Sequence, residues 1–389
     1  MESDKQNNSF DIVSCLPSEI VTNIFNRLDG KDILAASEVS TKWRNFIAES
    51  SHCLRKITLN LRQMILSNVK NPLYILTNNP RSYESIFAPG VNFCKKSKVA
   101  IIMSTSTRWK NIKIESSEFH ARLDYSDFFS RVEETLEDLR MKMVKVKDHS
   151  YSKLVRDMKF SKLTILQAYD VEHFFYENVF VNLTTLRQLL LRDRRLKASS
   201  KDAIVQLLRR NNDLKVLELS DSCFTDVMET QNIINGIQFK LEKLIIGGDF
   251  YDSFNYFKNL RNNFVRFLSS QKHTLTSLVF HSWMGLSVLK YVYQLPNLKF
   301  LCIKNVDRIN ELIDWTYVTL PKSNSLERVT LIDFPGSLEL MKTFATATAN
   351  ANFNVTFNPY AKFDQRIEIL YRIRRIFGKS LNLKFTNWY

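Results

Sequence analysis

One hydrophobic pattern recurs along most of the chain. An apolar residue is followed by two variable positions, a second apolar residue, one variable position and a third apolar residue. The 389-residue sequence contains nine copies that begin at Trp109, Leu136, Leu163, Leu186, Leu214, Leu241, Leu275, Leu298 and Leu326. Successive copies begin 23 to 28 residues apart, except for one step of 34 that indicates an insertion near residues 248–256. A repeat of this length predicts an array of similar units stacked side by side.

Each unit is predicted to contain a short strand, a loop and a helix. The apolar positions are expected to point into a core that neighbouring units share, because one such unit is not stable alone. The fold class is therefore α/β, with a curved parallel sheet and outer helices in a solenoid over residues 54–350. Leu54-x-x-Ile57-x-Leu59 fits the pattern as well and leaves room for one unrecognised unit before Trp109. Residues 351–389, with a helix expected over 364–377, are interpreted as the C-terminal cap of the array.

A second kind of pattern occupies residues 12–53, after a polar segment at 1–11 that we expect to be disordered. Ser18 and Asp32 are expected to cap two short helices, and a third short helix is expected to begin near Ser40. The first helix is predicted to carry its apolar residues on a single face: Ile20, Ile24, Phe25 and Leu28. Three short helices cannot build a deep core. Either they pack as a cap on the next domain or a partner protein covers them.

The order of residues in this module resembles the F-box, the adaptor-binding motif of modular ubiquitin ligases. Leu16-Pro17 stands at the start, an Ile24-Phe25 pair in the middle and Trp43-Arg44 at the end. The resemblance implies docking onto a Skp-type adaptor that is bound to a cullin scaffold. It assigns the following residues to adaptor contact or to the core of the motif: Leu16, Pro17, Ile20, Ile24, Leu28, Leu34, Val39 and Trp43. For Trp43, core packing and interface contact remain equally open.

The repeated units resemble leucine-rich repeats. The segment from Leu214 to Asp226 is similar to units that follow F-boxes, although Cys223 stands one place late. The whole chain thus resembles F-box proteins with leucine-rich repeats, the substrate receptors of Skp–cullin–F-box ubiquitin ligases. This implies a non-catalytic subunit that holds a protein target for ubiquitination. The alternative is an interaction scaffold that uses the same parts outside degradation.

The variable positions of the pattern indicate where a target would bind. Side chains alternate along a strand, so these positions are expected on the concave side of the sheet, opposite the core. Several combine aromatic and cationic groups, as protein-binding hot spots do. The predicted target contacts are Tyr169, Arg192, Lys243, His281, Phe300, Lys304 and Arg328. The alternative is that they are ordinary solvated strand residues.

The net charge of +15 belongs to the repeats, because residues 1–50 carry eight acidic against five basic residues. The positive electrostatic field of the repeats favours acidic partners, but it does not distinguish between a protein, a nucleic acid and a lipid surface. Acidic residues interspersed on the same strands, such as Glu115 and Glu218, argue against a nucleic-acid-binding surface.

Motifs for chemistry and membrane insertion are not evident. The six histidines show no paired metal-ligand spacing, so we expect no metal and no cofactor. Gly378-Lys379-Ser380 lacks the first glycine of a phosphate loop, since residue 373 is isoleucine. No apolar run approaches the length of a membrane span, and no hydrophobic leader is recognised. Five dispersed cysteines predict reduced thiols and a cytoplasmic or nuclear location.

Overall fold

The computed structural model describes residues 11–62, 83–93, 108–119, 125–146, 158–193, 196–229, 236–247, 257–281, 285–306, 315–334, 337–348, 351–357, 368, 371–372, 375 and 383–385. The chain divides into two compact units, Met1–Ile165 and Leu166–Tyr389. The expected disorder at 1–11 and the expected insertion at 248–256 fall outside the described residues, apart from Asp11. The expected helix at 364–377 falls largely outside them as well.

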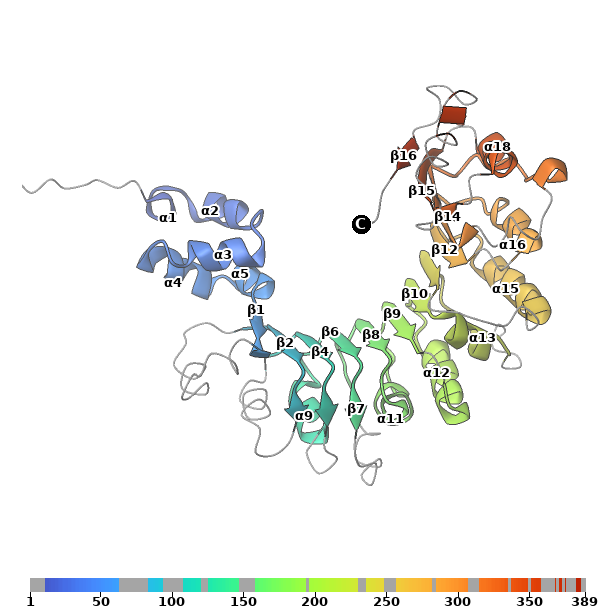
Figure 1. Cartoon of the computed structure of the whole chain (residues 1–389). Helices are drawn as coiled ribbons and strands as arrows, with labels where there is room; N and C mark the ends of the chain where they lie inside the picture. The colour runs from blue at the N-terminus through green and yellow to red at the C-terminus, as the bar shows by residue number, and fades with distance from the viewer. Residues whose placement is uncertain are drawn as a thin grey trace, which may run out of the picture. The chain divides into compact units, whose positions relative to one another are not determined.

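The first unit begins with a module of five short helices, here called the helical module (Figure 1): α1(Ile12–Cys15), α2(Ser18–Phe25), α3(Gly30–Ala36), α4(Thr41–Glu49) and α5(Ser51–Lys56). Helices α2, α3 and α4 confirm the three that the sequence predicts, whereas α1 and α5 were not anticipated. The helices enclose one small core formed by Val21, Phe25, Ile33, Ala36, Ile47, Cys53, Leu54 and Ile57.

Both predicted helix caps are wrong, whereas the third helix begins at Thr41, next to the predicted Ser40. The Oγ of Ser40 accepts a hydrogen bond from the Trp43 amide at 3.2 Å. Ser18 is not a cap, because Pro17 precedes α2 and no side chain caps it. Asp29 caps α3 in place of Asp32, because its Oδ1 accepts from the amides of residues 31 and 32 at 2.8 and 2.9 Å. Helix α3 therefore starts at Gly30, two residues before the predicted cap.

Parallel strands follow the helical module within the first unit. They hydrogen-bond in chain order: β1(Thr58–Asn60), β2(Ser85–Pro89), β4(Asn111–Glu115) and β6(Asp138–Lys142). A smaller parallel sheet joins β3(Asn92–Phe93), β5(Glu118–Phe119) and β7(Lys145–Val146). Helix α9(Tyr125–Val132) lies between β5 and β6 in the chain.

Strand β2 is the unit that the sequence left unrecognised. Ile86 and Ala88 occupy the second and third apolar positions and are buried. Tyr83 stands at the first position, so the copy has no leucine. The copy predicted at Leu54 is wrong in register: Leu59 pairs with Ile86 and so takes the second apolar position, and Leu54 itself lies in α5.

The second unit continues the same architecture. Its strands are β8(Ile165–Tyr169), β9(Gln188–Arg192), β10(Val216–Leu219), β11(Lys243–Ile246), β12(Ser277–His281), β13(Phe300–Lys304), β14(Arg328–Phe334), β15(Asn352–Phe357) and β16(Leu383–Phe385). Its helices are α11(His173–Phe175), the π-helix η2(Tyr176–Phe180), α12(Ala198–Arg210), α13(Asp221–Glu229), α15(Phe257–Gln271), α16(Gly285–Val292), the 3₁₀ helix η5(Trp315–Tyr317) and α18(Leu338–Ala347). The strands from β9 to β16 pair in parallel.

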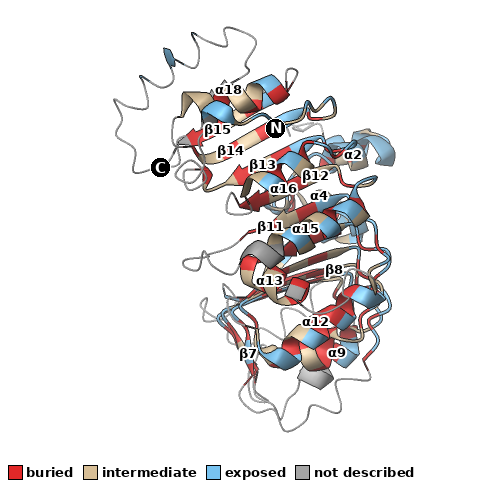
Figure 2. Ribbon diagram, turned by 90° about the vertical axis from the view of Figure 1, so that its right-hand side faces the viewer, coloured by how far each residue is buried: buried red, intermediate tan, exposed pale blue. Residues whose placement is uncertain are grey.

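The repeated apolar positions build the core. The side chains at the three repeated apolar positions of all nine copies are buried, with at most 3% of their surface exposed. Helices α12, α15 and α16 lie on one side of the strands of the second unit (Figure 1) and carry exposed residues on their outer sides (Figure 2). Val288, Leu289 and Val292 are the buried residues of α16. The predicted fold class is confirmed: a helical N-terminal module is followed by a large parallel sheet with helices.

Residues at or near the C-terminal ends of several strands adopt the left-handed conformation. Ser116, Met143, Asp170, Asn305 and Asp333 have φ between 49° and 59°. Each lies seven residues after the first apolar position of its copy. Such φ values are uncommon outside glycine, although Asp and Asn tolerate them. Their recurrence marks the same turn in successive units.

Candidate functional site

The helical module leaves large apolar side chains exposed on its surface. The exposed fractions are 46% for Ile20, 40% for Ile24, 37% for Leu34 and 65% for Val39. Burying one such side chain contributes about 1.5–3 kcal/mol. Single exposed apolar residues are ordinary. Several within about twenty residues of one small module indicate an interaction surface.

Helix α2 explains how two of these residues come to face outward. Val21 and Phe25 are buried in the module, whereas Ile20 and Ile24 are exposed. Residues four apart share a helix face, and adjacent residues are rotated by about 100° from each other. The predicted single apolar face is therefore wrong, because α2 has one apolar pair for the core and another for the surface. Leu28 is half-buried against the core.

Trp43 takes part in packing within the helical module. Its ring lies edge-to-face against Phe25, with centroids 5.5 Å apart. Its Nε1 donates to Oδ1 of Asp11 at 2.7 Å, which lowers the pKa of that carboxyl group. Trp43 therefore ties α4 to the start of α1 while staying half-buried. Leu16 is also half-buried, and Pro17 is exposed at the start of α2.

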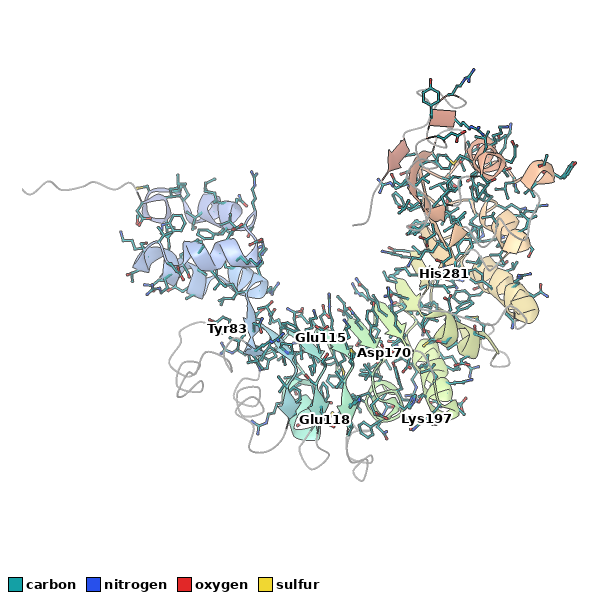
Figure 3. The ribbon with its side chains drawn as sticks, viewed as in Figure 1. Tyr83, Glu115, Glu118, Asp170, Lys197 and His281 are labelled. Atoms are coloured by element: carbon teal, nitrogen blue, oxygen red, sulfur yellow. The ribbon has the colours of Figure 1, made fainter. Side chains whose placement is uncertain are left out.

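Helix α5 joins the module to the first strands. Lys56 Nζ donates to the carbonyl oxygens of Asn26 and Leu28 at 2.6 and 2.8 Å, and so satisfies the C-terminal end of α2. Arg55 forms an ion pair with Glu84 at 3.1 Å, next to the labelled Tyr83 (Figure 3). The contacts to the strands thus run through α5. These contacts leave the exposed apolar residues of α2 and α3 uncovered. Packing of the helical module as a cap on the strands therefore does not explain why those residues are apolar.

Comparison with known families agrees with this geometry. Residues 13–55 match the family model of the F-box domain. The chain carries an F-box domain. None of the curated proteins matches the sequence. Among solved structures, the chain is similar to the crystal structure of the Rad7 and Elc1 complex in yeast, with 12% identity, coverage of 87% of this chain and 88% of that chain, and a TM-score of 0.33. A TM-score of this size is too low to equate two folds.

The residues assigned to adaptor contact therefore differ in their place on the F-box. Five are exposed: Pro17, Ile20, Ile24, Leu34 and Val39. Three are half-buried against the core: Leu16, Leu28 and Trp43. The F-box core itself is formed by other residues, among them Val21, Phe25 and Ile33. The exposed set is available to a partner without any change in the F-box fold.

A second candidate surface lies on the strands of the second unit. At one end of it, Tyr169 and Arg192 are held in an internal cluster. The Tyr169 hydroxyl donates to Oε1 of Glu218 at 2.9 Å, and Arg192 Nε forms an ion pair with the same oxygen. The Arg192 guanidinium also lies 4.8 Å from the centroid of the Tyr169 ring. Glu218 is buried, so both predicted contacts serve to satisfy its charge.

Three other cationic residues among the predicted target contacts are not held in such a cluster. Lys243 and Arg328 are exposed and Lys304 is half-buried. In the described part of the chain, none of the three forms an ion pair with a carboxylate. Arg328 lies over the ring of Phe300, 5.4 Å from its centroid, and Phe300 is 38% exposed. These four residues are on the face that the sequence predicts.

His281, which is labelled in Figure 3, departs from its predicted open position, because its side chain is buried. Its Nδ1 lies 3.6 Å from Oδ2 of Asp221 and 3.2 Å from Nδ2 of Asn305. A Cβ placed on Gly247 would come within 2.9 Å of His281 Nε2 and 3.4 Å of Lys304 Nζ. The missing side chain at residue 247 therefore leaves room for both the imidazole and the ammonium group beside Gly247.

Features of catalytic sites are sparse where the structure is described. No group of three His, Cys, Asp or Glu residues in those ranges is placed to hold a metal ion. Burial raises the pKa of Cys223 to about 12 and of Cys302 to about 11. Both thiols are protonated at neutral pH, whereas a nucleophilic cysteine needs a lowered pKa. In the same ranges, no helix combines the length and hydropathy needed to cross a membrane.

Proposed function

We propose that this chain is the substrate-recognition subunit of a Skp–cullin–F-box ubiquitin ligase. The F-box would bind a Skp-type adaptor joined to a cullin, and the strand face of the second unit would bind a protein target. The observation that carries the proposal is the F-box domain with Ile20, Ile24, Leu34 and Val39 exposed. Their apolar surface is the chemistry that a helical partner buries at the centre of an interface.

The repeats are proposed to be leucine-rich repeats. Parallel strands, a repeat of 23 to 28 residues and buried apolar positions in each copy support this. The described cysteines Cys15, Cys53, Cys223 and Cys302 are free thiols. Free thiols suit the reducing cytoplasm or nucleus, where the proposed complex would act.

The mechanism would be proximity. A target bound to the repeats is kept near a ubiquitin-charged enzyme that is held elsewhere in the assembly. Tethering replaces an encounter between separate molecules by one at high effective concentration. This requires no catalytic group in the chain itself, only two binding surfaces that can be occupied at the same time.

Affinity capture tests the adaptor surface. The chain is immobilised and recovery of the Skp-type adaptor and the cullin is measured for wild type and for the double variant Ile20→Lys, Val39→Lys. We expect both proteins to be lost, because two ammonium groups would be forced into an apolar interface. The matched control is Met143→Lys, an apolar residue with 49% exposure in the same unit but outside the F-box. Equal recovery by the double variant and wild type would refute the proposal.

Ubiquitin transfer separates the receptor from the scaffold. The captured complex is supplied with ubiquitin, its activating and conjugating enzymes and ATP, and modification of proteins bound to the chain is followed. A receptor is expected to support modification of a bound partner, and the Ile20→Lys, Val39→Lys variant is not. If the adaptor and cullin are recovered but no bound partner is ever modified, the chain acts as a non-degradative scaffold.

A further inference from the structure

The face formed by β11 to β14 has a regular chemical layout. The strand register aligns Lys243, Ser277, Phe300 and Arg328 in one row across the four strands. The next row is Ile245, Val279, Cys302 and Thr330, and all four are partly exposed. An apolar row is therefore bordered by cations at the start of the strands. We call this surface the β11–β14 face.

A third row adds cationic character at the other border. It contains Gly247, His281 and Lys304. His281 Nε2 and Lys304 Nζ both approach the position that a side chain of residue 247 would occupy. Nitrogen donors from two strands therefore converge beside the apolar row. Lys304 supplies the positive charge at this position, because His281 already faces the Asp221 carboxylate at 3.6 Å. A carboxylate or a phosphate group suits Lys304, because either one accepts hydrogen bonds and carries negative charge.

The same face of the first unit provides an internal comparison. There Lys142 pairs with Glu115 at 3.0 Å and Arg140 pairs with Asp138 at 2.8 Å. Lys142 also lowers the pKa of Glu115, which keeps that carboxylate charged. The cations of β6 are thus neutralised by acids on β4 and β6 themselves. Lys243, Lys304 and Arg328 have no such acid among the described residues, so their charge is available to a partner.

Acidic residues at the margin do not remove this charge. Glu242 and Glu327 stand just before β11 and β14, and both are exposed. Glu242 lies 3.6 Å from Lys215, and Glu327 lies 2.9 Å from Lys299. Each of these pairs is neutral on its own. The excess positive charge of the β11–β14 face is therefore carried by Lys243, Lys304 and Arg328.

We propose that the β11–β14 face binds an acidic segment of a protein that alternates anionic and apolar side chains. Apolar side chains would lie on Ile245, Val279 and Phe300, and anionic groups would reach the cations at the two borders. Neighbouring strands are about 4.8 Å apart, so the row spans about 14 Å, or about four residues of extended chain. This inference names the class of target and rests on the proposed receptor function.

Fluorescence anisotropy of the purified full chain tests the proposal. The probe is a fluorescein-labelled 12-residue peptide of alternating glutamate and leucine. The test variant is Lys243→Glu, Lys304→Glu, Arg328→Glu. The control is Arg266→Glu, Lys272→Glu, Lys290→Glu, which changes net charge equally through three exposed residues of the same unit that lie off the face. We expect at least about tenfold weaker binding for the test variant and a change below about twofold for the control.

The apolar part is tested with Phe300→Ser, for which binding should weaken several-fold. Tyr317→Ser changes an 84% exposed aromatic residue outside the face and should leave binding intact. A peptide with serine in place of leucine should bind weakly. A peptide with phosphoserine in place of glutamate distinguishes the source of the anion: tighter binding assigns phosphorylated targets, and weaker binding assigns carboxylates.

Three results would overturn the inference: equal loss in both triple variants, no loss in the test variant, or equal binding of a lysine–leucine peptide. Preferential binding of a single-stranded oligonucleotide would overturn it too and would assign the face to nucleic acid. Adaptor capture by the same variants separates this inference from the receptor proposal. If the adaptor is captured while the glutamate–leucine peptide fails to bind, only the target class is wrong. If the peptide binds but the adaptor is not captured, the ligase assignment is wrong.

Discussion

Single polar side chains determine where two of the F-box helices begin. Asp29 accepts the first amides of α3, and Ser40 accepts that of Trp43 at the start of α4. Ser40 followed by an apolar-periodic segment is a recognisable start signal. Asp29 gives no such clear signal, because an Asp-Gly pair is equally typical of a turn. The sequence therefore predicts that these helices exist better than it predicts where they begin.

The Asp29 cap makes the F-box sensitive to acid. The amides of residues 32 and 31 lower the pKa of its carboxyl group. The charged carboxylate is the form they stabilise. Its contribution is present above the unfolded-state pKa of about 3.9 and is lost as the pH falls through the lower folded-state pKa. Asp29→Asn keeps an acceptor oxygen but does not titrate.

We predict that the melting temperature of wild type falls more than that of Asp29→Asn as the pH is lowered from about 5 to about 3. Thermal unfolding followed by circular dichroism measures the difference at each pH. Asp32→Asn, whose side chain does not cap α3, should follow wild type. Parallel curves for wild type and Asp29→Asn would contradict the assigned role of the Asp29 carboxylate.

Among the elements, strands were predicted more accurately than helices. Nine copies of the pattern gave nine strands because a buried parallel strand requires apolar side chains at fixed positions. The strand at Ser85–Pro89 was not predicted, because its copy of the pattern has Tyr83 and Ala88 at positions where other copies have leucine. On α2, periodicity could not show which apolar side chains face the core, since Ile20 and Val21 have the same character. The exposed residues of the candidate adaptor site could therefore be identified only from the structure.

The contact between α3 and α5 limits what residue 30 can be. Gly30 is the first residue of α3, and a Cβ there would collide with the carbonyl oxygen of Lys56. The collision is with backbone, which cannot rotate away. We predict that Gly30→Ala destabilises the F-box by about 1–3 kcal/mol, the usual cost of overpacking.

Hydrogen exchange of the amides in residues 18–56 measures this effect, because local opening of the F-box is reported separately from the repeats. Lys31→Ala, an exposed change in the same helix, is the control and should leave exchange unchanged. Unaltered exchange in Gly30→Ala would mean that α3 and α5 are not in this close contact.

On the scale of the whole molecule, the two proposed binding surfaces belong to different compact units. The F-box surface is apolar and lies in Met1–Ile165, whereas the β11–β14 face is cationic and lies in Leu166–Tyr389. Changes to one surface should therefore leave binding at the other unaffected, since the two surfaces share no residue and belong to separate units. The net charge and the repeat pattern predicted a basic array. They did not predict which of its cations are already neutralised.

Titration of the purified chain with a purified Skp-type adaptor tests the central claim most directly. The dissociation constant is measured by calorimetry for wild type, Ile20→Lys, Val39→Lys and the control Met143→Lys. The exposed F-box residues are expected to act as interface anchors, so Ile20→Lys and Val39→Lys should each weaken binding at least about tenfold. Met143→Lys should bind as wild type does. Dissociation constants within about twofold of wild type for both F-box variants would contradict the account.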